Sequence, residues 1–95
     1  MYVVVSHHYV IAEQLEVGQQ ALTEMYEAMK NYEGFINRHN LTADDNSLHI
    51  TSVTYWQNKI HAQAWDDGPD RARIRGYSSE CWTEPPYRTG FTQFE

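Results

Sequence analysis

The sequence predicts an α+β domain in which helices cover one face of a four-stranded antiparallel sheet. Strand-like and helix-like patterns follow one another in the order β-α-β-β-α-β. The stretch Ala43–Ser47 has the Asp and Asn residues of a tight turn, so it joins two of the strands as a hairpin. The 95 residues contain no repeat, linker or low-complexity segment, which indicates one domain spanning residues 1–95.

The first strand is expected over Met1–Val10, where β-branched and aromatic residues are frequent. Its run Val3–Val5 is apolar on both faces, which is typical of a central strand. A helix is expected over Glu13–Asn31, and Gly34 is expected to end it in a left-handed conformation. Its apolar stripe, spaced i, i+3, i+4, i+7, consists of Leu22, Met25, Tyr26 and Met29.

The second and third strands are expected over Phe35–Thr42 and Leu48–Trp56, and the third alternates cleanly between two faces. One face carries Leu48, Ile50, Ser52, Thr54 and Trp56, and the other carries His49, Thr51, Val53 and Tyr55.

Asn58 is a suitable N-cap for a helix over Lys59–Trp65, in which Ile60 and Ala64 lie one turn apart. A weaker helix is expected over Asp70–Cys81, with Ile74, Tyr77 and Cys81 on one side. Pro85 and Pro86 then form a loop, and Tyr87–Glu95 is the last strand. This order is ferredoxin-like. Its uncovered sheet face, which bears Val53 and Tyr55, predicts a homodimer that packs sheet against sheet.

Composition and charge exclude several classes of function. Thirteen acidic against seven basic residues disfavour nucleic acid as a partner. RNA-binding domains share the element order, but Leu48–Trp56 lacks the basic start and the glycine of their third strand. No apolar run approaches the length of a membrane span, so no membrane partner is expected. The single Cys81 cannot form an internal disulfide, which fits a cytoplasmic location.

The stretch "YEGFI" (residues 32–36), the hairpin, and Tyr55-Trp56 followed by "QNKIHAQAW" resemble the antibiotic biosynthesis monooxygenase family of dimeric α/β barrels. The resemblance implies a small hydrophobic cavity between sheet and helices in each protomer. Some members insert oxygen into anthrones or quinols without metal, flavin or haem, while others degrade haem or isomerise small molecules.

The haem-degrading members have an Asn late in the first strand, a Trp in the second helix and a haem-ligating His about three turns later. Here His7 stands in place of that Asn and Trp65 matches the Trp, but no histidine follows His61. Haem degradation is therefore not expected, and no cofactor is expected. The five histidines have no HxH or HxxxH spacing, so a metal site is not expected either.

His7 is the candidate catalytic base, on the condition that the Val3, Val5 and His7 face looks toward the helices. Otherwise it is a strand histidine near the surface. Ser52 is a candidate for orienting the substrate. The candidate substrate-binding residues, for which core packing is the alternative, are Trp56, Trp65, Tyr26, Met29 and His61. Arg71, Arg73 and Arg75 are expected on a solvated face that pairs with nearby aspartates.

These observations together favour a cofactor-independent monooxygenase that acts on a small hydrophobic aromatic molecule of the anthrone or quinol kind. Two alternatives stay open. One is a non-catalytic ligand-binding or interaction module on the same dimeric barrel, and the other is an isomerase or cyclase of the same superfamily.

Overall fold

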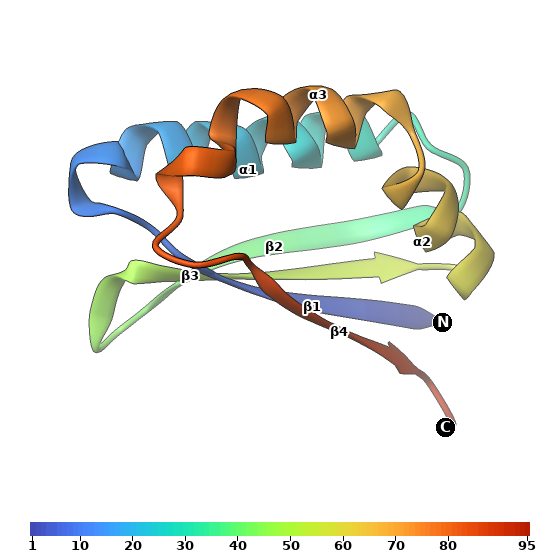
Figure 1. Cartoon of the computed structure of the whole chain (residues 1–95). Helices are drawn as coiled ribbons and strands as arrows, with labels where there is room; N and C mark the ends of the chain where they lie inside the picture. The colour runs from blue at the N-terminus through green and yellow to red at the C-terminus, as the bar shows by residue number, and fades with distance from the viewer.

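The computed structural model describes all residues 1–95 and confirms the expected ferredoxin-like fold, with every helix on one face of the sheet (Figure 1). The sheet order is β2-β3-β1-β4, and each neighbouring pair is antiparallel. The strands are β1 (Tyr2–Tyr9), β2 (Phe35–Ala43), β3 (Asn46–Trp56) and β4 (Tyr87–Thr92). The helices are α1 (Leu15–Met29), α2 (Lys59–Asp66) and α3 (Pro69–Ser78), with the short 3₁₀ turns η1 (Ala12–Gln14) and η2 (Ser79–Cys81).

The register of β1 against β3 decides which residues face the helices. Val4 lies opposite Thr54 and His8 lies opposite Ile50, and all four of these residues are buried. Residues directly opposite in an antiparallel pair point to the same face. The set Val4, Ser6 and His8 therefore faces the helices, and the neighbouring set Val3, Val5 and His7 faces away from them.

Helix α2 begins where the sequence predicts. The side chain of Asn58 accepts hydrogen bonds from the backbone N–H groups of Ile60 and His61, at 3.0 and 3.4 Å, so Asn58 is the N-cap. Ile60 and Ala64, which lie one turn apart, are both exposed. Ile60 is 77% exposed, and the buried face consists of Ala62 and Trp65.

Gly34 has a role different from the expected helix end. Helix α1 ends at Met29, so Gly34 lies outside it, in the turn that leads into β2. Its φ of 81° is in the left-handed region that favours glycine. A Cβ at this position would also clash with the ring of His61. Gly34 thus lets α2 pack closely on the start of β2.

The core lies between the sheet and the helices. One cluster of buried apolar residues consists of Val4, Met29, Trp56, Ala62 and Trp65. Farther along α1 and α3, Leu22 and Ile74 are buried almost completely. Tyr77, expected beside Ile74, is 45% exposed, and Ser78 is buried in its place. No helix here combines the length and the hydrophobicity of a membrane-spanning segment.

Candidate functional site

A cavity of about 450 Å³ lies between the sheet and the helices and extends to the segment that joins η2 to β4. All four strands and all three α-helices contribute to its lining. The cavity is large enough for a ligand of two or three fused rings, since small-molecule sites usually have volumes of ~300–1,000 Å³.

All three tryptophans of the chain line this cavity. Trp56 is packed edge-on against Phe35 at 5.6 Å between ring centroids, and Trp65 is packed edge-on against Tyr32 at 5.0 Å. These contacts fix the rings of both predicted residues. Both line the cavity and also belong to the core, with only 1% of Trp56 and 3% of Trp65 exposed. Trp82, which the sequence analysis did not select, lies after η2. Its ring is tilted by 48° against that of His8 at 5.0 Å.

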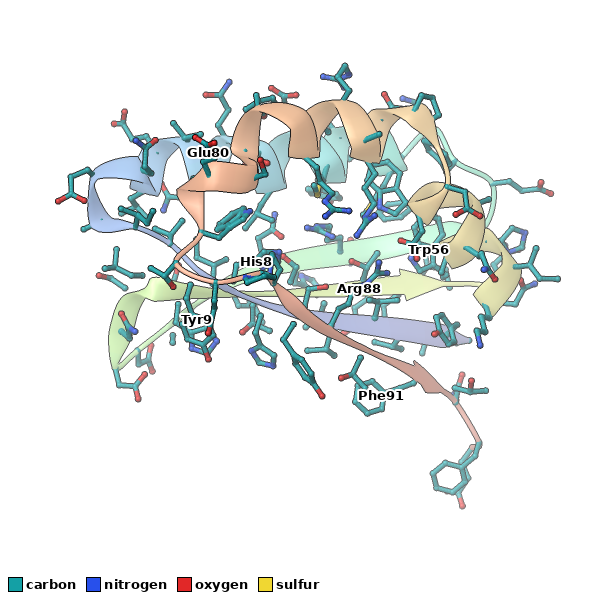
Figure 2. All side chains as sticks on the ribbon, viewed as in Figure 1. His8, Tyr9, Trp56, Glu80, Arg88 and Phe91 are labelled. Carbon is teal, nitrogen blue, oxygen red and sulfur yellow. The ribbon has the colours of Figure 1, made fainter.

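The predicted position of His7 is wrong, because its condition is not met. His7 lies on the sheet face that no helix covers, where its Nδ1 is 3.0 Å from Nε2 of His49 and 3.1 Å from the hydroxyl of Thr51. The next residue, His8, lines the cavity instead. Figure 2 shows His8 on the helix side of the sheet and Tyr9 on the opposite side.

The hydrogen bonding of His8 determines its tautomer. Its Nδ1 lies 3.3 Å from the carbonyl oxygen of Ile50. A carbonyl only accepts, so Nδ1 carries the proton and the Nε2 of the neutral ring has a free lone pair. Burial, with a smaller contribution from the charge of Arg38, lowers the pKa of His8 to about 4. At neutral pH the cavity therefore contains a neutral imidazole that can accept a proton at Nε2.

Arg38 of β2 is a buried cation without an anionic partner in the protein. Only 6% of the residue is exposed, and it lines the cavity. Its guanidinium donates to three neutral oxygens, those of Thr54 at 2.9 Å and of Ser52 and Asn40 at 3.1 Å. Burial, followed by the charge of Arg88, lowers the pKa of Arg38 to about 10, so it remains charged at neutral pH.

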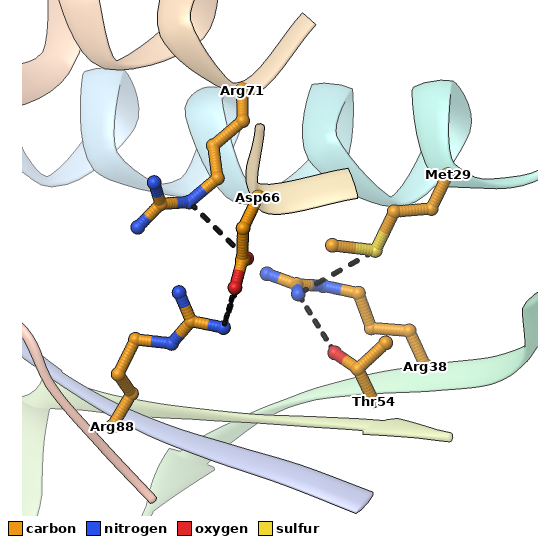
Figure 3. Close-up of polar contacts among 6 residues, drawn as sticks. All are labelled: Met29, Arg38, Thr54, Asp66, Arg71 and Arg88. Carbon is orange, nitrogen blue, oxygen red and sulfur yellow. Dashed lines mark hydrogen bonds and ion pairs between the residues drawn. The ribbon is translucent and has the colours of Figure 1, made fainter. Parts of the chain in front are cut away.

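Asp66 at the end of α2 is shared by two other arginines of the cavity (Figure 3). Arg88 donates to Asp66 Oδ2 at 3.1 Å and lies 3.0 Å from Oδ1, while Nε of Arg71 is 3.8 Å from Oδ1. Oδ1 nevertheless accepts no well-directed hydrogen bond. Burial and the charge of Arg88 lower the pKa of Arg71. The single negative charge of Asp66 is thus shared between the positive charges of Arg71 and Arg88.

The expected solvated face is confirmed for Arg73 and Arg75, which are exposed, and Arg73 pairs with Glu24 and Asp70 outside the cavity. Arg71 is half-buried and pairs with Asp66, the kind of aspartate partner that was expected. Arg71 and Arg75 line the cavity. They are four residues apart, and residues at this spacing share one face of a helix.

The other predicted site residues are divided by the structure. Met29 lines the cavity. Ser52 is fully buried and does not line the cavity. Its hydroxyl donates to Asn40 at 2.8 Å and accepts from Arg38 at 3.1 Å. Tyr26 packs against Phe35 and lies under Nζ of Lys30. His61 covers Gly34. Neither Tyr26 nor His61 lines the cavity.

The sequence did not decide which face of β1 the helices cover, so His7 was selected on a condition and His8 was not selected. Val3 and Val5 make the side of His7 more apolar than the side of Ser6 and His8. Val10 has the same parity as His8, and an apolar residue there is the one sequence signal for the other side. Arg38 gave no signal, because a lone arginine in a strand usually lies at the surface.

No group of three or more His, Cys, Asp and Glu side chains is placed to hold a metal ion. Cys81 is buried, and its burial raises the pKa of the thiol. It is a small apolar core residue, as expected.

Comparison with known proteins places the chain in a family. The sequence profile described as antibiotic biosynthesis monooxygenase matches residues 1–76. No curated protein sequence matches the chain. A Nitrosomonas europaea structure that carries the family name superposes with a TM-score of 0.91 at 16% identity, covering 100% of both chains.

Two further structures show the same fold. Rv0793 from Mycobacterium tuberculosis has a TM-score of 0.90 at 13% identity, with 99% of this chain and 95% of that chain covered. A variant of SnoaB, a cofactor-independent oxygenase from Streptomyces nogalater, has a TM-score of 0.86 at 13% identity, with coverages of 99% and 93%. Since the family profile matches most of the sequence, this chain belongs to the antibiotic biosynthesis monooxygenase family.

Proposed function

We propose that the protein is a cofactor-independent monooxygenase that oxidises a small aromatic molecule of the anthrone or quinol kind in the cavity between sheet and helices. The observation that carries the proposal is the pairing of a neutral, proton-accepting His8 with three tryptophans around one cavity. Family membership and the fold shared with a cofactor-independent oxygenase support it.

The reaction on an anthrone needs only the substrate and O₂. A CH₂ group and O₂ give a carbonyl group and one water molecule, so the substrate supplies all of the electrons. The aromatic ring lies among the tryptophans, where stacking and burial favour it. Nε2 of His8 accepts a proton from the substrate, and the resulting carbanion or phenolate transfers an electron to O₂.

The low basicity of His8 makes the nearby arginines necessary. A phenol with an ordinary pKa near 10 would lose its proton to an imidazole of pKa about 4 at a cost of roughly 8 kcal/mol. Cations within a few ångströms lower the pKa of such a phenol. Arg38 and Arg88 line the same cavity and supply that charge. Ser52 holds the guanidinium of Arg38 in place, which makes Ser52 a positioning residue.

Oxygen uptake with dithranol, a simple dihydroxyanthrone, tests the proposal. In a metal-free buffer containing chelator at pH 7, we expect saturable uptake above the spontaneous rate, with one O₂ consumed per quinone formed. The variant Trp56→Ala should raise KM more than it lowers kcat, because stacking and burial act on ground state and transition state alike. Saturable binding without any uptake across anthrones and quinols would favour the ligand-binding alternative.

We further propose that two copies of the chain associate through the sheet face that the helices leave uncovered. The register places Val5 and Val53 on this face, and Tyr87 and Phe91 of β4 beside them. Its strand residues include no Lys, Arg, Asp or Glu. Phe91 is 53% exposed in the single chain, and a second sheet would bury it. Light scattering after size-exclusion chromatography should give twice the 11.2 kDa of one chain; a stable monomer at micromolar concentration would contradict the proposal.

A further inference from the structure

The cavity has an excess of positive charge that the rest of the molecule does not have. The chain carries a net charge of −6, with only seven Lys and Arg residues. Four of these seven line the cavity: Arg38, Arg71, Arg75 and Arg88. Only two carboxylates, Asp66 and Glu84, line it with them.

Two of the three basic residues outside the cavity have carboxylate partners, and the third, the exposed Lys59, makes no ion pair. Lys30 pairs with Glu27 at 3.1 Å, and Arg73 pairs with both Glu24 and Asp70. In the cavity, by contrast, Arg71 and Arg88 share Asp66, and neither Arg38 nor Arg75 makes an ion pair. The protein has many acidic side chains, yet few of them neutralise the arginines of the cavity.

The guanidinium of Arg38 has a hydrogen-bond donor that no group of the protein accepts. A guanidinium has five N–H donors. Three of them reach the oxygens of Thr54, Ser52 and Asn40, and a fourth points at the sulfur of Met29 at 3.8 Å. One N–H of Arg38 thus has no acceptor in the protein. A buried cation without a counter-ion is costly, and an anion supplied by a ligand removes that cost.

The anion must belong to a flat aromatic molecule, because the arginines and the tryptophans line the same space. Arg38 and Trp56 lie on neighbouring strands, and Arg38 also touches Met29, which packs with Trp56 and Trp65 in one cluster. A carboxylate oxygen can accept the one N–H of Arg38 that has no partner in the protein, and a hydrogen bond between two charged groups is stronger than one to a neutral oxygen.

We propose that the ligand of this cavity is an aromatic carboxylate whose anionic group is bound by Arg38, with Arg88, Arg71 and Arg75 drawing it into the cavity. The inference rests on the proposed function and deepens it by naming the substrate class. A neutral anthrone or quinol gives Arg38 a counter-ion only after it has lost its proton, whereas a carboxylate supplies one as soon as it binds.

A matched pair of probes tests the inference without any turnover. Anthraquinone-2-carboxylate and the uncharged anthraquinone-2-carboxamide have the same rings, and their binding can be followed by calorimetry or tryptophan quenching at pH 7.5. A hydrogen bond to a charged group favours the carboxylate by about 10–100-fold in Kd. Equal affinities for the two probes, or binding of neither at millimolar concentration, would overturn the proposal.

Variants assign the preference to Arg38. In Arg38→Met the carboxylate should lose its advantage and bind within about threefold of the amide. Thermal melting checks that this variant is folded, because it loses three hydrogen bonds together with the buried charge. Arg38→Lys, which keeps the charge, should retain part of the preference. The control Arg73→Met removes the same charge outside the cavity and should leave the preference unchanged. A full preference in Arg38→Met contradicts the assignment.

The binding and oxygen-uptake experiments fail independently. Carboxylate selectivity without oxygen uptake would support the anion site and contradict the monooxygenase proposal. Oxygen uptake with neutral anthrones by a protein that shows no carboxylate selectivity would support the monooxygenase proposal and contradict the anion site.

Discussion

The two faces of the sheet differ in a way that hydrophobicity alone does not reveal. The face under the helices carries His8, Ser52 and the buried cation Arg38. The face without helices carries Val3, Val5 and Val53 but no formally charged residue. In this small domain the more apolar side of β1 is therefore the side that its own helices leave open. The contrast teaches that an apolar face of a strand predicts burial of that face. It does not predict whether the chain's own helices or a second molecule buries it.

The largest expected effect follows from placing a charge on the open face. Val53→Asp puts a carboxylate opposite Val5, in a surface that we expect to be sealed in the dimer. An unpaired buried charge costs about 3–5 kcal/mol, so the dimer should dissociate or the protein unfold. Light scattering and thermal melting measure the outcome. Ala72→Asp, at an exposed position of α3, is the control for the added charge alone. A Val53→Asp protein that remains a stable dimer would show that this face is not the interface.

The next prediction compares two adjacent histidines. His8→Ala removes the proton acceptor of the cavity, and a positioned general base contributes ~10²–10⁴-fold, so turnover should fall by that factor while the substrate still binds. His7→Ala, on the opposite face, should keep turnover within a few-fold. Steady-state oxygen uptake with both variants decides between them. The reverse order of effects would restore His7 as the base and remove His8 from the mechanism.

Acid should destabilise the protein through His8. Its pKa in the folded chain, about 4, lies below the ordinary 6.5, so the unfolded chain takes up the proton first as the pH falls. Stability is therefore complete above pH 6.5, declines between 6.5 and 4, and loses roughly 3 kcal/mol in total to this group. Urea unfolding of the wild type and of His8→Gln across this pH range measures the difference. A parallel decline in the two proteins would mean that other groups cause it.

The smallest expected effect concerns the helices that cover the cavity. Asn58→Ala removes the two hydrogen bonds that begin α2, at a cost of about 1 kcal/mol in the free energy of unfolding. The oligomeric state should not change, because Asn58 is remote from the open face. Urea denaturation with light scattering on the same sample checks both statements. A loss well under half of the expected value would indicate that packing of Trp65 alone holds α2.

Much of the fold could be predicted from the sequence, because hydrophobic periodicity and turn chemistry are local signals. The alternation over Leu48–Trp56 gave the right faces for β3, and Asn58 gave the start of α2. Which face of β1 the helices cover is not local, since it depends on register against β3 and on what covers the other side. Trp56, Trp65 and Met29 line the cavity and His7 lies on the opposite face of the sheet, while the binding of a ligand by these three residues stays a prediction.

The clustering of arginines at the cavity could not be predicted from the sequence either, because it also depends on contacts between distant segments. Arg38 and Arg88 lie on the two edge strands, β2 and β4, and Arg71 lies on α3. Only the folded chain brings them to one cavity. Spacing within one segment predicts a shared face, as it does for Arg71 and Arg75, but it carries no information about charges that meet across the sheet.

The alternation of β1 also has a consequence for engineering. Consecutive codons of this strand specify residues on opposite faces of the sheet, with Val4, Ser6 and His8 lining the cavity and Val3, Val5 and His7 on the open face. A combinatorial library that varies only the even-numbered codons would search ligand preference while the outer surface of the sheet stays constant. A library of the odd-numbered codons would do the reverse. One eight-residue strand thus determines part of the cavity lining and part of the open sheet face, and mutagenesis can change each separately.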